Sequence, residues 1–211
     1  PRLTQGELVK EFERQFASWL GIKYAVFVNS GSSANLLMYY ALLLSGRLKN
    51  KKVIVPAISW PTSVTPAIQL GFEPIMCEAE AETFGLDPNY LEDLLKKHDP
   101  AAVVIVHVLG VPNQMASILE LKRRYGFILM EDACAALGSR YGGTLVGNFG
   151  DISTFSFYFG HHISTIEGGM VLTNDEELHD LLLHSRSHGW AKDLAPEKEA
   201  ALAGANSVIE F

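Results

Sequence analysis

Two adjacent histidines, His161 and His162, lie in a segment of serine, aromatic and glycine residues that runs from Ser156 to Gly169. An imidazole titrates near neutral pH, so a histidine in a turn can accept and donate a proton during a reaction. Adjacent side chains are poor joint ligands for one metal ion, so the pair gives little support to a metal site. The competing interpretation is an exposed histidine pair satisfied by the backbone and by water.

A second segment, from Asn29 to Asn35, reads Asn-Ser-Gly-Ser-Ser-Ala-Asn and lies between a strand pattern and a helix pattern. At such a junction the backbone N–H groups near Gly31, the helix dipole and the hydroxyls of Ser32 and Ser33 can hold a phosphate group. A serine cap beside a glycine turn is the alternative. The segment lacks the glycine-lysine pair of a P-loop.

A third segment ends an apolar strand pattern on two acids, Glu131 and Asp132. Successive side chains of a strand point to opposite faces, so the two carboxylates are expected on opposite sides of the sheet. Asp132 is the candidate for a carboxylate held against a protonated cofactor ring nitrogen, which makes the ring withdraw electrons. A cap for the following turn is its alternative role.

Trp60 follows another strand pattern, within Pro-Ala-Ile-Ser-Trp-Pro-Thr. Its indole offers a flat surface on which a planar ligand could stack. A tryptophan in a loop is more often a packing residue, so this interpretation depends on the other segments.

His184 and His188 have the i, i+4 spacing of a metal-binding pair on a helix. A zinc site needs a third ligand, and no further ligand or acidic partner accompanies them in the sequence. We therefore expect an ordinary helix surface there and no metal site in the chain.

The elements that must position these residues alternate along the chain. Helices are expected near 8–19, 33–44, 62–70, 89–97, 116–125 and 176–187, and strands near 24–28, 53–55, 74–77, 102–108, 127–131, 154–158 and 169–173. Short apolar strands between amphipathic helices predict an α/β fold with a mostly parallel sheet flanked by helices. Ligands of such sheets bind at the carboxyl ends of the strands, where the segments above fall.

The 211 residues include 24 acidic and 17 basic side chains, a formal net charge of −7. This length can bury a domain core, and the acidic balance disfavours nucleic acid or an anionic membrane as a partner. No apolar run approaches the roughly 20 residues that span a bilayer, so we expect a cytoplasmic protein. Cys77 and Cys134 are too few and too far apart for a disulfide framework or a four-thiolate metal site.

Taken together, these segments resemble the DegT/DnrJ/EryC1/StrS family of nucleotide-sugar aminotransferases, over essentially the whole chain. The motifs are Gly-Ser-Ser-Ala-Asn, the Ser-Trp loop, Glu-Asp-Ala-Cys, and Ser-Phe-Tyr-Phe-Gly-His-His followed by Glu-Gly-Gly. The resemblance implies a fold-type I, aspartate-aminotransferase-like fold that binds pyridoxal 5′-phosphate (PLP) or pyridoxamine 5′-phosphate (PMP). It implies cofactor contacts for Gly31, Ser32, Ser33, Trp60, Asp132 and Ser156, an acid–base role for His161, and an approach of His188 to the same site.

Two positions depart from the family pattern. Ala135 stands where Gln, His or Glu is common, and His161 stands where a lysine binds the cofactor covalently. A histidine at this position is similar to the sugar 3-dehydratase branch, in particular to members that act on GDP-linked 4-keto-6-deoxy sugars. The resemblance implies a lyase of deoxysugar and lipopolysaccharide biosynthesis that takes a nucleotide-sugar substrate and glutamate and works as a homodimer.

Other functions stay open. An iron–sulfur-dependent CDP-sugar branch also has histidine here, but its cluster cysteines follow the segment corresponding to 187–189, and residues 191–211 contain no cysteine. An aminotransferase would need Lys192 or Lys198, more than 30 positions after His161. A binding protein without turnover fits the loss of lysine but not the retained ring-binding residues.

Residues 1–190 are expected to form a large cofactor-binding domain. Residues 191–211, rich in Ala, Glu and Lys at their start, are expected to begin the connection to a small C-terminal domain outside this chain. The sequence begins without Met and stops within a possible strand, so we expect a piece of a longer protein.

Overall fold

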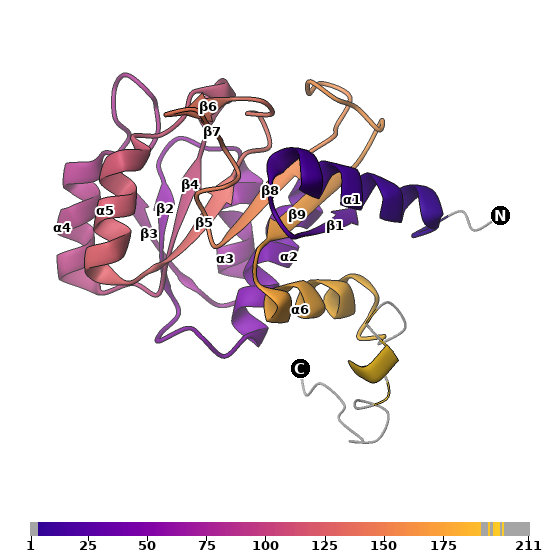
Figure 1. Ribbon diagram of the computed structural model, residues 1–211. Helices are drawn as coiled ribbons and strands as arrows, with labels where there is room; N and C mark the ends of the chain where they lie inside the picture. The colour runs from indigo at the N-terminus through magenta and orange to yellow at the C-terminus, as the bar shows by residue number, and fades with distance from the viewer. Residues whose placement is uncertain (1–3, 191–193, 195, 199, 201–211) are drawn as a thin grey trace.

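The computed structural model describes residues 4–190, 194, 196–198 and 200, so most of the expected connection at 191–211 lies outside the described residues. One seven-stranded sheet has the order β1-β9-β8-β5-β4-β2-β3 (Figure 1). Its strands are β1 (Tyr24–Val28), β2 (Lys52–Pro56), β3 (Glu73–Cys77), β4 (Ala102–Val106), β5 (Ile128–Asp132), β8 (Ile152–Ser156) and β9 (Gly169–Thr173). The helices are α1 (Glu7–Leu20), α2 (Gly31–Leu44), α3 (Thr65–Gln69), α4 (Pro88–His98), α5 (Met115–Tyr125) and α6 (Glu176–Arg186).

The sheet is mostly parallel, as the sequence predicts. β3, β2, β4, β5 and β8 pair in parallel, whereas β9 runs antiparallel to both β8 and β1. Ser156, the last residue of β8, lies opposite Gly169, the first residue of β9. Both ends of the intervening histidine segment are therefore held by neighbouring strands, and the segment projects as a loop beyond the sheet (Figure 1).

Helices cover both faces of the sheet because side chains alternate along each strand. Val104, Met130 and Val171 pack in one core with α2, α3 and α6. Val103 and Leu129 face the opposite side, where α4 and α5 lie next to each other (Figure 1). A third cluster packs α1 against β1, β8 and β9. None of the helices in the described part of the chain is long and apolar enough to cross a membrane.

The prediction of one continuous helix at 62–70 is wrong, because the structure has two separate short helices in this segment. A 3₁₀ helix, η1, spans Pro61–Ser63, and α3 begins only at Thr65. Pro66 has no N–H to donate to the carbonyl four residues earlier, so a continuous helix cannot pass through it; proline instead favours the first turn of a new helix. This break leaves Ser63 facing the sheet.

Two further differences concern the strands: one strand ends earlier than predicted, and one hairpin was not predicted. The strand predicted at 102–108 ends at Val106 and is followed by a short 3₁₀ helix, η2 (Val108–Gly110). The sequence analysis did not predict the hairpin that β6 (Arg140–Tyr141) and β7 (Thr144–Leu145) form. Its turn is Gly142-Gly143, with φ of 56° and 86°, and positive φ at both central residues matches the right-handed twist of a hairpin.

Candidate active site

The N-terminus of α2 forms one side of the candidate site. Ser30 caps the helix: its Oγ accepts a hydrogen bond from the Ser33 N–H at 3.0 Å and lies 3.1 Å from the Ser33 Oγ. The capping role that the sequence left open thus belongs to Ser30, and the exposed Ser32 lies in the first turn. The first-turn N–H groups of a helix have no partner within the helical ladder, so they can bind an anion.

Gly31 brings the expected phosphate-binding segments together. A Cβ atom at this position would lie 2.6 Å from the Cβ of Ser156 and 3.3 Å from the Sγ of Cys134. A Cβ atom at Gly169 would lie 2.1 Å from the Ser30 carbonyl oxygen. Only residues without side chains allow these approaches, so the start of α2, the end of β8 and the turn after β5 meet at one point.

Gly31→Ala is expected to lower the free energy of unfolding of the full-length protein by about 1–3 kcal/mol, the usual range for an overpacked site. The added methyl group must push α2 away from Ser156. Urea denaturation measures the loss, and Gly160→Ala is the control because its Cβ would sit in ordinary contact with Tyr158, at 3.5 Å. Adding Ser156→Gly to Gly31→Ala should recover most of the loss; no recovery would contradict the steric explanation.

Asp132 lies at the end of β5, 4% exposed, and accepts three hydrogen bonds. Its Oδ2 accepts from the Asn35 Nδ2 at 2.9 Å and from the Ser63 Oγ at 2.7 Å. Its Oδ1 accepts from the Cys134 N–H at 3.0 Å. All three partners are donors, so the side chain is arranged as an acceptor.

Two of these partners, Asn35 and Ser63, were not among the predicted site residues. Asn35 was visible in the Gly-Ser-Ser-Ala-Asn motif, where it follows Gly31 by four residues and so shares its face of the helix. Ser63 carried no signal, because the sequence predicted an unbroken helix through its position. Only the packing of α2 and η1 against β5 shows that both side chains meet one carboxylate.

Glu131 points to the opposite side of the sheet, as strand alternation predicts. Its carboxylate is fully buried and accepts hydrogen bonds from the N–H groups of Gly147, Phe149 and Gly150. The His107 Nε2 lies 2.9 Å from it, while the His107 Nδ1 accepts from the Asn113 N–H. The imidazole is therefore the Nε2–H tautomer. The Glu131 carboxylate holds the loop between β7 and β8 through these three N–H groups.

His161 lies in the turn after β8, where its backbone N–H donates to the Tyr158 carbonyl oxygen at 2.9 Å. Partial burial, and then the neighbouring His162, hold the pKa of the His161 imidazole below its ordinary value, while the carboxylate of Asp132 acts in the opposite direction. A lowered pKa keeps the imidazole neutral at neutral pH, the form that accepts a proton.

His162→Gln is expected to move the acidic limb of the pH–rate profile to higher pH. The basic form of His161 disappears as pH falls through its pKa, and removing the repulsion by His162 raises that pKa. The measurement is kcat/KM against pH for the reaction of the full-length protein, with His98→Gln, in the last turn of α4, as the control. A limb that stays in place, or moves to lower pH, would contradict this role of His162.

The remaining predicted residues are less well connected. Trp60 lies directly before η1 with 73% of its surface exposed, three residues from the Ser63 that binds Asp132. His188 is exposed beyond the end of α6 and has a φ of 62°. Its ring lies edge-on to the ring of Trp190, with the two ring centroids 6.5 Å apart. No contact links it to His161 within the described residues. The roles of Trp60 and His188 stay predictions.

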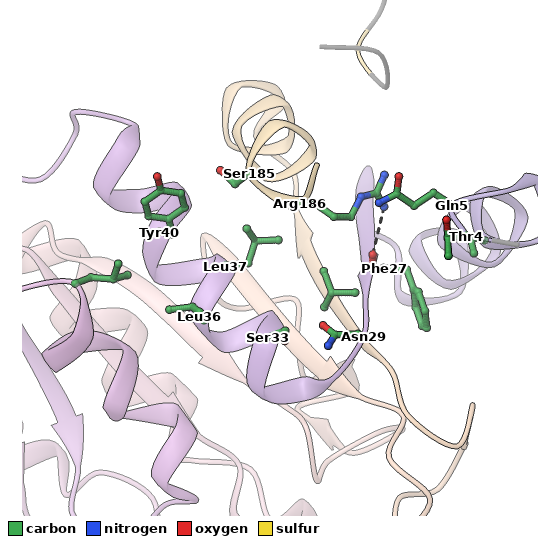
Figure 2. Close-up of a pocket in the computed structure, with 13 residues that line it drawn as sticks. Thr4, Gln5, Phe27, Asn29, Ser33, Leu36, Leu37, Tyr40, Ser185 and Arg186 are labelled. Atoms are coloured by element: carbon green, nitrogen blue, oxygen red, sulfur yellow. Dashed lines mark hydrogen bonds between the residues drawn. The ribbon is translucent and has the colours of Figure 1, made fainter. Parts of the chain in front are cut away.

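A cavity of about 690 Å³ lies beside α2; Ser33 of the predicted phosphate-binding segment lines it, whereas Asp132 does not. Figure 2 shows Ser33, Leu37 and Tyr40 along α2 lining it, with Arg186 donating to the Phe27 carbonyl oxygen at 3.3 Å. Much of the lining is apolar, and neither Asp132 nor its three donors contributes to it. We therefore place the candidate site at the carboxyl edge of the sheet rather than in this cavity. No group of three or more metal-ligating side chains occurs within the described residues.

The chain is similar to proteins of one known family. The model of the DegT/DnrJ/EryC1/StrS aminotransferase family matches residues 1–210. The GDP-4-keto-6-deoxy-D-mannose 3-dehydratase of Yersinia pseudotuberculosis is 40% identical over 194 residues, which cover 90% of this chain and 49% of that protein. The dTDP-4-dehydro-2,6-dideoxy-D-glucose 3-dehydratase of Saccharopolyspora spinosa is 38% identical over 197 residues, which cover 91% of this chain and 42% of that protein.

A solved structure of a GDP-4-keto-6-deoxymannose-3-dehydratase with a trapped PLP-glutamate geminal diamine is also similar. It superposes with a TM-score of 0.83 at 39% identity, covering 90% of this chain and 50% of that one. The likeness confirms the predicted fold class. The chain spans about half the length of the curated relatives it matches.

Proposed function

This chain belongs to the DegT/DnrJ/EryC1/StrS aminotransferase family, and from that premise we propose that the whole protein is a PLP- or PMP-dependent nucleotide-sugar 3-dehydratase. It removes the C3 hydroxyl of a 4-keto-6-deoxy sugar carried on GDP, with glutamate as amino donor, in deoxysugar biosynthesis. One observation carries the proposal. An imidazole, His161, occupies the position of the family lysine in the loop after β8, the strand that pairs with β5 at the intact Asp132 cluster.

The residues present fit a cofactor that has a phosphate group and a protonated ring nitrogen. The absence of a side chain at Gly31 lets Ser156 pack against the first turn of α2, so the Ser156 hydroxyl and the first-turn N–H groups lie together, where they can bind a phosphate. A carboxylate offers about four acceptor positions, and the described residues fill three of those on Asp132. The fourth, on Oδ1, suits a ring N–H, and the exposed indole of Trp60 suits the ring face.

When bound, the cofactor supplies a primary amine and an electron-withdrawing ring. Asp132 keeps the ring nitrogen protonated. His161 forms no covalent bond; its neutral ring nitrogen accepts a proton, and the resulting imidazolium donates one to the C3 oxygen as it departs as water. Over one turnover a C3–O bond is replaced by a C3–H bond, glutamate is oxidised to 2-oxoglutarate, and ammonia is released.

The choice of GDP rests on the Tyr-Phe-Gly-His-His segment and on the name of the Yersinia relative. The proposal also includes two domains, with residues 1–190 as the cofactor-binding part and 191–211 leading to a small domain. The proposal also includes a homodimer, because large apolar side chains that follow β4 and β8, namely Leu109, Phe159 and Ile166, are 68–86% exposed. We include a cytoplasmic location, since the charged co-substrates do not cross a membrane unaided.

The decisive experiment supplies the full-length protein with PMP, glutamate and GDP-, dTDP- or CDP-linked 4-keto-6-deoxy sugars. We expect the GDP-linked sugar to give a 3-deoxy product with one ammonia and one 2-oxoglutarate per sugar, measured by mass spectrometry and coupled assays. An amino sugar formed without ammonia would indicate an aminotransferase. No product from any sugar would indicate a binding protein.

A covalent test accompanies the product assay. The full-length protein is incubated with PLP, reduced with borohydride and weighed by mass spectrometry. Because histidine cannot replace lysine as the covalent anchor, the protein should keep its unmodified mass. A cofactor adduct on an active-site lysine would contradict the proposal.

A further inference from the structure

We propose that Asn35 is a positioning residue for the cofactor, whose amide, held in one orientation by Thr154, aims the open acceptor position of Asp132 at the ring nitrogen. The inference rests on the proposed function, because it requires a cofactor ring at Asp132. It adds a residue from α2 to the ring-nitrogen contact and links that contact to the phosphate end of the site.

The amide of Asn35 is fixed at both of its ends. Its Nδ2 donates to the Asp132 Oδ2 at 2.9 Å, and its Oδ1 accepts from the Thr154 Oγ at 2.7 Å. Turning the amide over would place its oxygen against a carboxylate and its NH₂ against the hydroxyl that now donates to it. Asn35 and Thr154 are 2% and 0% exposed, so water cannot repair such an error.

The neighbouring strands set this geometry. Thr154 on β8 lies directly opposite Asp132 on β5 in the parallel register. The side chains of Thr154 and Ser156 share one face of β8, while Gly31 and Asn35 share one face of α2. Gly31 therefore contacts Ser156 at the phosphate end, and Asn35 contacts Thr154 at the ring end.

Ser63 completes the orientation of Asp132 but constrains it less. It approaches the same Oδ2 from η1 through a single hydroxyl that can rotate. Its backbone carbonyl accepts from the Tyr39 hydroxyl at 2.9 Å. Burial, and then the charge of Asp132, raise the pKa of Tyr39, so that its hydroxyl stays a donor. The side-chain amide of Asn35 is planar and hydrogen-bonded at both ends, so it is the group that sets the direction of the Asp132 carboxylate.

The test uses the full-length protein and PMP labelled with ¹⁵N in the ring. Thr154→Val removes the hydroxyl while keeping the volume and frees the amide to turn; Thr154→Ser restores a hydroxyl. Asn35→Leu removes the amide, and Asn89→Leu, on the exposed surface of α4, is the matched control. The readouts are the ¹⁵N shift of the bound ring nitrogen, the Kd of PMP, and urea denaturation of the cofactor-free protein.

We expect Asn35→Leu and Thr154→Val to move the ring-nitrogen shift toward the unprotonated value. Both should raise the Kd roughly tenfold, as for a lost hydrogen bond to a charged group. Thr154→Ser and Asn89→Leu should match the parent. In an Asp132→Asn background, Asn35→Leu should change the Kd little further, because residues of one network are not additive.

Two outcomes would overturn the inference, and they are distinguishable. If Asp132→Asn shifts the ring nitrogen but Asn35→Leu and Thr154→Val change only the urea midpoint, Asn35 has a structural role alone and the proposed function stands. If Asp132→Asn leaves the ring-nitrogen shift at the parent value, the contact between Asp132 and the cofactor is wrong, and the role of Asn35 is lost with it. A variant too unstable to bind PMP is replaced by the other, since either one breaks the same amide contact.

Discussion

Replacing His161 by asparagine in the full-length protein is expected to slow dehydration of the sugar by roughly 10²–10⁴-fold, the range for a lost acid–base group. Asparagine keeps the approximate size and some hydrogen bonding of histidine but has no group that titrates near neutral pH. The measurement is single-turnover formation of the 3-deoxy sugar, with His98→Asn as the control for a general effect of losing a histidine.

Binding and chemistry should separate in this variant. The Kd of the nucleotide sugar should stay near the parent value, because His161 acts on a proton rather than on the nucleotide. His161→Lys should permit a covalent bond to PLP and shift the products away from the 3-deoxy sugar. Dehydration by His161→Asn at the parent rate would remove His161 from the reaction.

Asp132→Asn is expected to lower kcat by about 100-fold or more, equivalent to a few kcal/mol of barrier. Its partners in the protein are three donors, so whichever way the new amide turns, its NH₂ group faces at least one donor. A neutral amide also cannot hold a proton on the ring nitrogen as a carboxylate does.

The matched control for this change is Asp93→Asn, because the Asp93 side chain on α4 is 77% exposed and 4.0 Å from its nearest cation. It should leave kcat at the parent value. Circular dichroism checks that Asp132→Asn still folds, since the loss is expected in the reaction. Near-parent turnover by a folded Asp132→Asn protein would exclude Asp132 from the cofactor contact.

The sequence predicts those parts of the fold that depend on local patterns. Period-two alternation separates Glu131 from Asp132, and the structure places their carboxylates on opposite faces of β5. Gly21 ends α1 in the left-handed region with φ of 83°, as a glycine after an amphipathic run indicates. Both features follow from the geometry of one element, so no knowledge of neighbouring elements is needed.

The parts that the sequence did not predict depend on which elements become neighbours. The meeting of Asn35 and Ser63 at Asp132 requires the strand order of the sheet, and the antiparallel direction of β9 requires its pairing with both β8 and β1. A local signal was available for the missed hairpin, since Gly142-Gly143 is a favoured two-residue turn. Pro66 also carried a signal, because it argues against a continuous helix.

The reversed direction of β9 bears on how chemistry can change within this architecture. His161 lies in a segment whose two ends, Ser156 and Gly169, are paired with each other in adjacent strands. The residues from Tyr158 to Glu167 are exposed, apart from the half-buried His161, so this loop lies outside the sheet that folding depends on. Natural selection can therefore exchange the residue at position 161, or vary the length of the loop, without repacking the core. Under the proposed function, a lineage could pass between amino transfer and deoxygenation by mutations here whose effect on folding is small.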